Sequence, residues 1–197
     1  MPNFDTQLVS ALLQNRRSLY PAQYSSDPVD DSIVKEMLEN ANWAPTHRLT
    51  EPWRFVVFKG EGLQRLAKFQ SELYKDVAQK KGNFKEATYE KLAAKPMLAS
   101  HVIAIGMKRD EKESVPVEEE IASVAMAVQN MYLTATAHGI GAYWGSGGVT
   151  YFEEAKEFFG LGANDKLMGF MYLGNLKIDK WPQGRRKPIE DKVTWEV

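Results

Sequence analysis

The longest regular pattern in the sequence is EEEIASVAMAVQNMYLTATAHGIGAYWGSGG, which runs from Glu118 to Gly148. Residues 118–138 are rich in alanine, methionine and valine on most sides, which predicts a long helix that is buried on most of its faces. Gly139 is expected to end this helix, and residues 141–144 form a third strand in chain order. The glycine-serine-glycine turn that follows can approach a flat ligand closely, because no Cβ intervenes.

Apolar periodicity predicts the remaining elements. Asp5 is a plausible N-cap for a first helix with an apolar face formed by Leu8, Val9, Leu12 and Leu13. Helical spacing also recurs over residues 33–41, 63–81 and 84–94, and Thr150 is expected to cap a short helix that ends at 158–160. Residues 53–59 are predicted as a buried strand, and 101–107 and 166–174 as further strands. These elements predict one α+β domain over residues 1–197, with a central sheet wrapped by helices.

Composition excludes several classes of protein. A hydrophobic fraction of 44% and a charged fraction of 26% are typical of a soluble globular protein. The net charge of -1 gives no electrostatic footprint for nucleic acid. No apolar run approaches the ~18 residues that a membrane span needs, and residues 1–10 lack the apolar core of a signal peptide. The sequence has no cysteine, which excludes disulfides and thiol catalysis and is consistent with the reducing cytoplasm.

A basic tripeptide, Arg16-Arg17-Ser18, follows the first predicted helix. Guanidinium groups and a serine hydroxyl suit a phosphate group. The same residues are equally compatible with a basic helix C-terminus that complements the helix dipole.

Three other segments have both a structural and a functional interpretation. Residues 43–48, Trp-Ala-Pro-Thr-His-Arg, could be a loop stiffened by proline or could present His47 to a ligand. Residues 144–147, Trp-Gly-Ser-Gly, could be a turn that permits tight packing or a platform for a ring. Residues 184–188, Gly-Arg-Arg-Lys-Pro, could be a solvated tail or an anion-binding segment. The histidines have no metal-ligand spacing with carboxylates, so no metal site is predicted.

In their order and spacing, these segments resemble the nitroreductase family of FMN-dependent oxidoreductases, in particular its compact subgroup. The resemblance extends from about Leu8 to Pro188. It implies an α+β sandwich with a mainly antiparallel sheet, and a homodimer that holds two FMN molecules at its interface.

The resemblance also implies roles for individual residues. Arg16, Arg17 and Ser18 would hold the FMN phosphate and ribityl chain, and Arg186 would reach the phosphate from the tail. Trp144, Gly145, Ser146 and Gly147 would lie beside the isoalloxazine ring. Trp43, Pro45, Thr46 and His47 would meet the FMN from the other subunit. Two positions depart from the family pattern: Tyr20 replaces a basic residue near the flavin pyrimidine, and Glu51 replaces a glutamine. Arg17 and Arg48 both remain candidates for the missing cation.

The function implied is ping-pong hydride transfer from NAD(P)H through FMN to a small aromatic acceptor, such as a nitroaromatic or a quinone. No side chain is assigned as acid, base or nucleophile, because the cofactor carries the chemistry. The alternatives are a flavin-binding carrier or redox-sensing protein with little turnover, and an interaction domain that has lost its flavin.

Overall fold

The structure is a computed structural model that describes residues 3–197. Met1 and Pro2, the first residues of the predicted domain, lie outside the described residues. The main elements in chain order are α1 (Thr6–Asn15), α2 (Asp31–Asn42), β1 (Trp53–Lys59), α3 (Glu61–Lys80), α4 (Glu86–Ala94), β2 (His101–Met107), α5 (Val117–Ala137), β3 (Gly141–Gly145) and β4 (Lys166–Gly174). Short 3-10 turns join them: η1 (Pro21–Gln23), η2 (His47–Leu49), η3 (Lys95–Leu98), η4 (Gly148–Tyr151), η5 (Glu153–Ala155), η6 (Glu157–Phe159) and η7 (Glu190–Lys192). None of the helices within residues 3–197 is long and apolar enough to cross a membrane.

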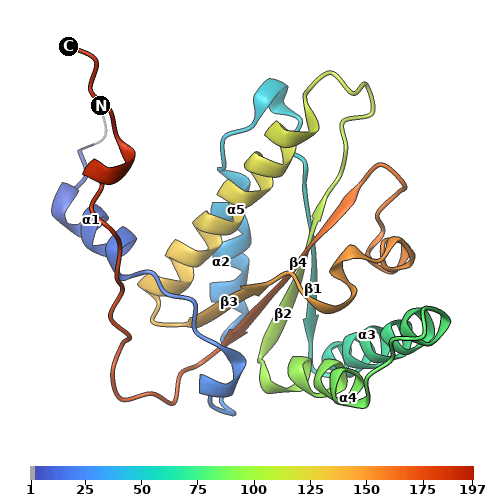
Figure 1. Ribbon diagram of the computed structural model, residues 1–197. Helices are drawn as coiled ribbons and strands as arrows, with labels where there is room; N and C mark the ends of the chain where they lie inside the picture. The colour runs from blue at the N-terminus through green and yellow to red at the C-terminus, as the bar shows by residue number, and fades with distance from the viewer. Residues whose placement is uncertain (1–2) are drawn as a thin grey trace.

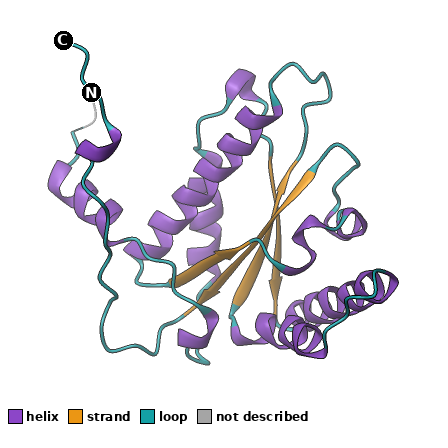
Figure 2. Cartoon of the chain, in the orientation of Figure 1, coloured by secondary structure: helices purple, strands orange, loops and turns teal. Residues whose placement is uncertain are grey.

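The sheet has the order β1-β2-β4-β3, and each neighbouring pair is antiparallel (Figure 2). This confirms the predicted α+β class and the mainly antiparallel sheet. The ladder between β2 and β4 shifts register between Ile105 and Gly106. The strand β2 is buried along its whole length, whereas β1 and β3 form the two edges.

Helices cover both faces of the sheet (Figure 1). On one face α2 and α5 pack side by side over a core that includes Met37, Ile103, Ile105, Met131 and Met171. The other face is covered by α3 together with the turns η4 to η6, around a second core that includes Leu66, Val102, Phe159 and Phe170. The sheet therefore separates two cores, which is the expected sandwich.

Several sequence predictions of individual elements were wrong in detail. The predicted buried strand 53–59 is an edge strand. Of its seven residues, only Trp53 and Phe58 are buried. Thr150 does not cap a helix, because it lies inside η4 and its hydroxyl donates to the carbonyl of Gly147 at 3.0 Å. The region that follows is a series of 3-10 turns, although Gly160 does end it with a left-handed φ of 69°.

The two apolar helices are also less buried than their sequences suggest. No residue of α1 is buried, and Leu8 and Leu13 of its apolar face are 69% and 50% exposed. In α5, which was predicted to be buried on most of its faces, Met131 is fully buried but Met126 is 38% exposed. Both helices therefore keep an apolar face that this chain does not cover.

The C-terminal segment runs back alongside α1 (Figure 1). The indole of Trp181 donates to the carbonyl of Asn15 at 2.7 Å, and Arg17 Nε donates to the carbonyl of Pro182 at 2.9 Å. These contacts bring the basic residues 185–187 to the end of α1, where the Arg16-Arg17-Ser18 tripeptide begins.

Candidate functional site

The tripeptide Arg16-Arg17-Ser18 is held against the open edge of β3. The amide of Leu19, the next residue, donates to the carbonyl of Ala142 at 2.9 Å. The hydroxyl of Tyr24 then donates to the carbonyls of Leu19 at 2.6 Å and Tyr172 at 3.0 Å. These bonds join the segment after α1 to strands β3 and β4, so the tripeptide has a fixed position in the fold.

Tyr24 fits here because two glycines leave room for its ring. A Cβ on Gly141 would lie 2.5 Å from the Tyr24 ring, and one on Gly174 would lie 2.4 Å from it. Burial raises the pKa of the Tyr24 hydroxyl, and the nearby Tyr132 raises it further. The hydroxyl therefore stays protonated and keeps donating to the two carbonyls.

Tyr132 of α5 connects the two segments that the sequence singles out. Its hydroxyl accepts a hydrogen bond from the amide of Trp144 at 2.6 Å and lies 3.4 Å from the Ser18 hydroxyl. The guanidinium carbon of Arg16 lies 5.1 Å from the centre of the Tyr132 ring, a cation–π arrangement. Arg16 Nη1 is also 3.5 Å from the Ser18 hydroxyl. One chain thus brings Arg16, Ser18 and Trp144 together.

Sequence reasoning did not identify Tyr132 as a site residue. Its only signal was its position, a tyrosine on an otherwise apolar helix, and such residues usually belong to the core. Its ring is indeed buried, with only 6% of the residue exposed. Its hydroxyl nevertheless organises the site, because it fixes both the β3 edge and the Ser18 side chain.

The open edge of β3 leads into the glycine-serine-glycine turn. In an antiparallel strand, the polar groups of alternate residues point to the same side. Ala142 and Trp144 point away from β4, and the amide of Trp144 is used by Tyr132, which leaves the Trp144 carbonyl on the open edge. The turn residues Ser146 and Gly147 are exposed, and a Cβ on Gly147 would meet no atom within 4 Å. This edge offers backbone groups to a flat ligand.

The position of the turn depends on Gly169 of β4. This residue has a φ of 118°, and a Cβ on it would lie 2.4 Å from the carbonyl oxygen of Gly145. The indole of Trp144 donates to the carbonyl of Met168 at 2.9 Å, which fixes the side chain before the turn. Gly145 itself is buried, so it contributes to packing and not to an exposed surface.

A basic cleft lies at the other end of the site. It has a volume of about 600 Å³, and its lining includes Asn15, Arg17, Gly184 and Arg186. Arg17 donates through Nη1 to the carbonyls of Gln14 at 2.6 Å and Arg16 at 2.8 Å, so its guanidinium is fixed at the end of α1. Arg186 is exposed and donates only to the neighbouring Arg185 carbonyl among the described contacts. The structure therefore places Arg186 beside Arg17.

Tyr20 stands where the family pattern has a basic residue, but a lysine from another element, Lys95, lies close by. The Tyr20 ring lies 4.7 Å from the ring of Tyr143, measured between centroids. The Lys95 ammonium lies 4.7 Å from the centre of the Tyr143 ring and 4.4 Å from that of Tyr172. Burial lowers the pKa of Lys95, and the neighbouring charge of Lys91 lowers it further. Of the two candidate cations, Arg17 is tied to carbonyls and Arg48 lies elsewhere, on η2.

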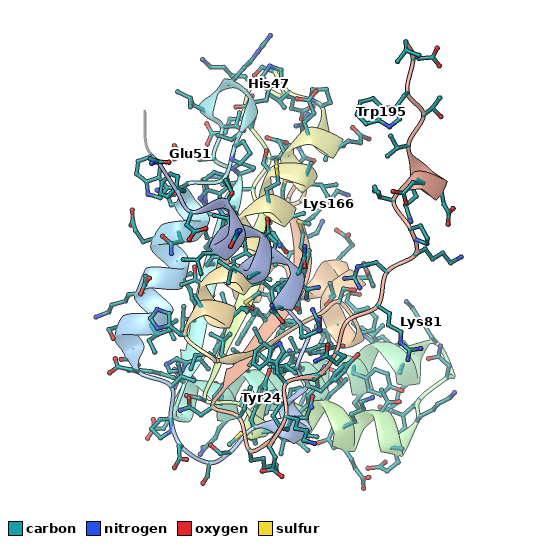
Figure 3. All side chains as sticks on the ribbon, turned by 90° about the vertical axis from the view of Figure 1, so that its left-hand side faces the viewer. Tyr24, His47, Glu51, Lys81, Lys166 and Trp195 are labelled. Atoms are coloured by element: carbon teal, nitrogen blue, oxygen red, sulfur yellow. The ribbon has the colours of Figure 1, made fainter. Side chains whose placement is uncertain are left out.

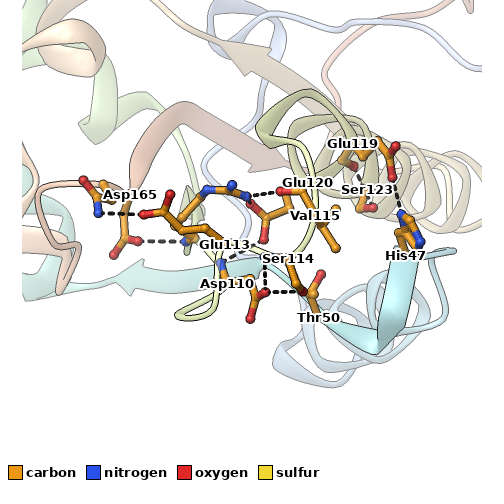
Figure 4. A network of polar contacts seen from close by, with 12 residues as sticks. His47, Thr50, Asp110, Glu113, Ser114, Val115, Glu119, Glu120, Ser123 and Asp165 are labelled. Atoms are coloured by element: carbon orange, nitrogen blue, oxygen red, sulfur yellow. Dashed lines mark hydrogen bonds and ion pairs between the residues drawn. The ribbon is translucent and has the colours of Figure 1, made fainter.

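Within one chain His47 lies far from Arg16, whereas Trp43, at the end of α2, lines a cavity together with Leu12 of α1 and Asn130 of α5. His47 Nδ1 is 2.5 Å from a carboxylate oxygen of Glu119, in the first turn of α5 (Figure 4). Arg16 lies over Tyr132, thirteen residues further along the same helix. At a rise of 1.5 Å per residue, the separation along the axis is roughly 20 Å. Figure 3 shows His47 at the opposite end of the molecule from Tyr24.

The loop that carries His47 is both exposed and strained. Trp43 and Leu49 are 79% and 81% exposed, and Pro45 is exposed as well. Arg48, Leu49 and Glu51 have positive φ values of 52°, 54° and 43°, an arrangement that non-glycine residues rarely adopt. The Thr46 hydroxyl accepts from the amide of Glu51 at 3.2 Å and so closes the loop. The Glu51 amide is thus engaged within the chain.

A buried ion pair fixes the loop between β2 and α5. The Glu120 side chain is fully buried and accepts hydrogen bonds from Arg109 and, at 2.9 Å, from the amide of Asp110 (Figure 4). Asp165 accepts from the amides of Arg109 at 2.8 Å and Gly162 at 2.7 Å. The loop of residues 108–116 is therefore tied to the start of α5 and to the segment before β4.

The residues that converge fit a planar ligand with a phosphate. Arg16, Ser18 and the Arg17–Arg186 cleft supply cationic and hydroxyl donors at one end. At the other end, the Trp144 carbonyl lies on the edge of β3, and a Cβ on Gly147 would meet no atom within 4 Å. This donor set matches the phosphate and ring ends of FMN.

Comparisons with known proteins identify relatives of this chain in sequence and in fold. The sequence pattern of the Nitroreductase family matches residues 13–175. The protein named "Putative NAD(P)H nitroreductase YfhC" of Bacillus subtilis (strain 168) is 30% identical over 190 residues, which are 93% of this chain and 91% of the relative. The crystal structure of a nitroreductase-like family protein from Bacillus cereus has a TM-score of 0.79 and 25% identity, and the match covers 100% of this chain and 98% of that one. The FMN and NADPH-dependent nitroreductase NfnB from sphigopyxis sp. strain HMH shares the fold, with a TM-score of 0.70, 18% identity and coverage of 95% and 98%.

Proposed function

The chain belongs to the nitroreductase family, and on that premise we propose that it is an NAD(P)H-dependent oxidoreductase with FMN as its cofactor. The observation that supports this best is the contact of Tyr132 with both Ser18 and Trp144. That contact joins the phosphate-binding chemistry after α1 to the exposed turn after β3. The FMN-dependent nitroreductase NfnB, which has the same fold, is consistent with the proposal.

Each part of the site has a separate task in this proposal. Arg16, Ser18 and Arg186 hold the phosphate and the chain next to it, and Arg17 holds the tail segment in place through the Pro182 carbonyl. The β3 edge and the Ser146–Gly147 turn support the ring. Bound FMN would supply the redox chemistry, by accepting hydride from NAD(P)H and passing electrons to a nitroaromatic or quinone in a ping-pong cycle.

We further propose that the working form is a homodimer with FMN at the interface. The apolar face of α1 and the side chains of Trp43 and Leu49 are exposed in one chain, and such surfaces commonly mark interaction sites. His47 is too far along α5 to reach the Arg16 end of its own site. A second copy would bring Trp43, Pro45, Thr46 and His47 to the first copy's ring. The cysteine-free sequence suits a cytoplasmic location.

The proposal is tested by two measurements on the purified protein. We expect a yellow protein whose visible spectrum has the bands of oxidised flavin, released without a covalent bond on denaturation. We also expect steady oxidation of NADH or NADPH when a quinone is added. A protein that neither contains nor takes up FMN would contradict the proposal. A yellow protein without turnover would instead support the flavin carrier or redox sensor.

A further inference from the structure

We propose that the hollow beside Ser146 is the acceptor site and that it selects flat aromatic acceptors carrying an anionic group. This rests on the proposed function, because it is the Ser146 turn that would place the ring of FMN next to the hollow. The hollow has a volume of about 380 Å³, and its lining includes Trp144, Ser146, Phe152, Lys156 and Lys166. This volume lies at the lower end of the range for small-molecule sites.

The walls of the hollow favour a flat apolar ring. Trp144 cannot rotate freely, because its indole donates to the Met168 carbonyl at 2.9 Å. Tyr151 is 75% exposed at the rim, while Phe152 is half-buried. Aromatic rings attract each other in offset or edge-to-face arrangements. A bicyclic aromatic compound could therefore pack against the rings of Trp144 and Phe152.

The charges around the hollow favour an anion. The Lys156 side chain is only 14% exposed, and its ammonium is held by the Glu153 carboxylate at 2.5 Å and the Ala163 carbonyl at 2.9 Å. Lys166, the first residue of β4, is exposed and is the second lysine in the lining. Glu153 is the only acidic side chain in the lining, and 77% of it is exposed. Because this ion pair between Glu153 and Lys156 neutralises most of the Lys156 charge, Lys166 is the main cation that the lining offers to an anion.

Neighbouring groups add to this balance. Asp165, which precedes Lys166, is occupied by the amides of Arg109 and Gly162 and is therefore engaged away from the lysine. The ammonium of Lys81, at the end of α3, lies 5.6 Å from the centre of the Phe152 ring (Figure 3). Lys81 does not line the hollow, so Lys156 and Lys166 are the lysines that a bound anion would meet. A neutral ring would gain only the aromatic walls, whereas an anionic ring would also gain the lysines.

The test compares matched anionic and neutral compounds on the FMN-loaded protein. Binding of 2-naphthalenesulfonate and of neutral 2-naphthamide is measured by isothermal titration calorimetry, which does not depend on turnover. Turnover is measured with a sulfonated naphthoquinone and with 2-methyl-1,4-naphthoquinone. The variants are Lys166→Gln and Lys156→Gln, and the control is Lys68→Gln on the exposed surface of α3. Because Lys166 is exposed, its variant keeps the test valid if Lys156→Gln does not fold.

We expect the parent to bind the sulfonate more tightly than the amide, with a preference that falls as salt is added. Lys166→Gln should weaken sulfonate binding about two- to fivefold, the range of an exposed ion pair. The ratio of kcat/KM for the sulfonated quinone to that for the neutral quinone should fall by a similar factor, through KM and not kcat.

Three results would overturn the inference. They are equal binding of the two naphthalenes by the parent, equal effects of Lys166→Gln and Lys68→Gln, and an effect of Lys166→Gln on reduction by NADPH but not on quinone reduction. The last result would assign the hollow to the dinucleotide. In each case the protein still holds FMN and oxidises NAD(P)H, so the proposed function stands. A protein without FMN would instead contradict the proposed function.

Discussion

At the scale of single residues, the site depends on side chains whose positions are fixed by their hydrogen bonds. Tyr132 illustrates this, because its hydroxyl is the only contact that joins the Trp144 amide to the Ser18 side chain within the described residues. Arg17 illustrates a different outcome. The sequence suggested it as a ligand for phosphate or as the cation near the pyrimidine, and its guanidinium donates through Nε and Nη1 to three carbonyls, which fixes it in the lining of the basic cleft.

Arg16 is expected to contribute more to FMN affinity than Arg185. Arg16 lies over Tyr132 beside Ser18, whereas Arg185 is exposed in the tail. A hydrogen bond to a charged group contributes about 1.5–3 kcal/mol, so Arg16→Ala should weaken FMN binding at least about tenfold. Fluorescence titration of the apoprotein with FMN measures this, with Arg185→Ala as the control. Equal affinities of the two variants would refute the assignment of Arg16.

His47 is expected to orient the cofactor and not to be essential for the chemical step. Its Nδ1 is bound to Glu119, which leaves only Nε2 to face another group. His47→Ala should retain FMN and slow its reduction by NADH, by at most about 10²–10³-fold, the range for an electrostatic donor. Stopped-flow absorbance measures the rate, and Glu118→Gln, at the exposed position next to Glu119 in α5, is the control. A variant that holds FMN but shows no flavin reduction would show that the ring is essential.

At the scale of elements, Asp31 ties the start of α2 to two strands. Its carboxylate accepts from Lys59 of β1 and from His101 Nε2 of β2, the latter at 3.1 Å. The hydrogen bond from Lys59 and then that from His101 lower the pKa of Asp31. A carboxyl whose pKa is lower in the folded state stabilises the fold above its unfolded value of about 3.9. That contribution is lost as the pH falls through the lower folded value.

Asp31→Asn should therefore reduce stability at neutral pH, and its difference from the parent should shrink below about pH 4. Urea unfolding at several pH values between neutral and acid gives the free energy of unfolding of both proteins. Asp76→Asn, an exposed change on α3, is the matched control. A difference from the parent that stays constant at every pH would mean that the Asp31 carboxylate has no stabilising charge interaction.

Most elements could be predicted from the sequence, because their apolar periodicity agrees with their burial. The strand at 101–107 and the helix at 118–138 were placed to within one residue of β2 and α5. The misplaced features have a common physical cause, which is that a single sequence does not reveal what covers an apolar face. The apolar run in β1 belongs to an edge strand, and the faces of α1 and Met126 remain exposed. Thr150 does not cap a helix, because its hydroxyl donates a hydrogen bond to the Gly147 carbonyl.

The site was predictable in part for the same reason. Arg16, Ser18 and Trp144 were expected to lie together, and they do. Tyr132 and Lys95 were missed, because nothing in the local sequence distinguishes them from a core tyrosine and a surface lysine. Their relevance depends on the packing of α5 and η3 against β3, which is a tertiary property.

At the scale of the whole molecule, one chain carries the two proposed halves of the FMN site at positions that do not meet. His47 contacts Glu119 near the start of α5, and Arg16 contacts Tyr132 near its end. These two contacts are roughly 20 Å apart along the helix axis. A two-fold arrangement of two copies is the simplest way to bring the halves together, because each interface patch then serves both sites.

The protein is expected to sediment as a homodimer, and Leu49→Glu should shift it toward the monomer. Leu49 is 81% exposed in one chain, so a buried charge in the dimer would be costly, whereas the fold of the single chain would be little affected. Analytical ultracentrifugation with and without FMN measures the association, and Gln64→Glu on the outer surface of α3 is the control. A stable monomer that still binds FMN tightly would contradict both the dimer and the shared site.

The fit of Tyr24 between Gly141 and Gly174 has a consequence for how this protein can diverge over generations. A methyl group at either glycine would occupy the space of the Tyr24 ring, so no one of the three positions can drift alone toward a larger side chain. Homologues with a larger side chain at either glycine position should therefore have a smaller residue in place of Tyr24. Genetic exchange within this region between homologues of the two kinds would produce chimaeras that fold poorly, even if each parent folds well.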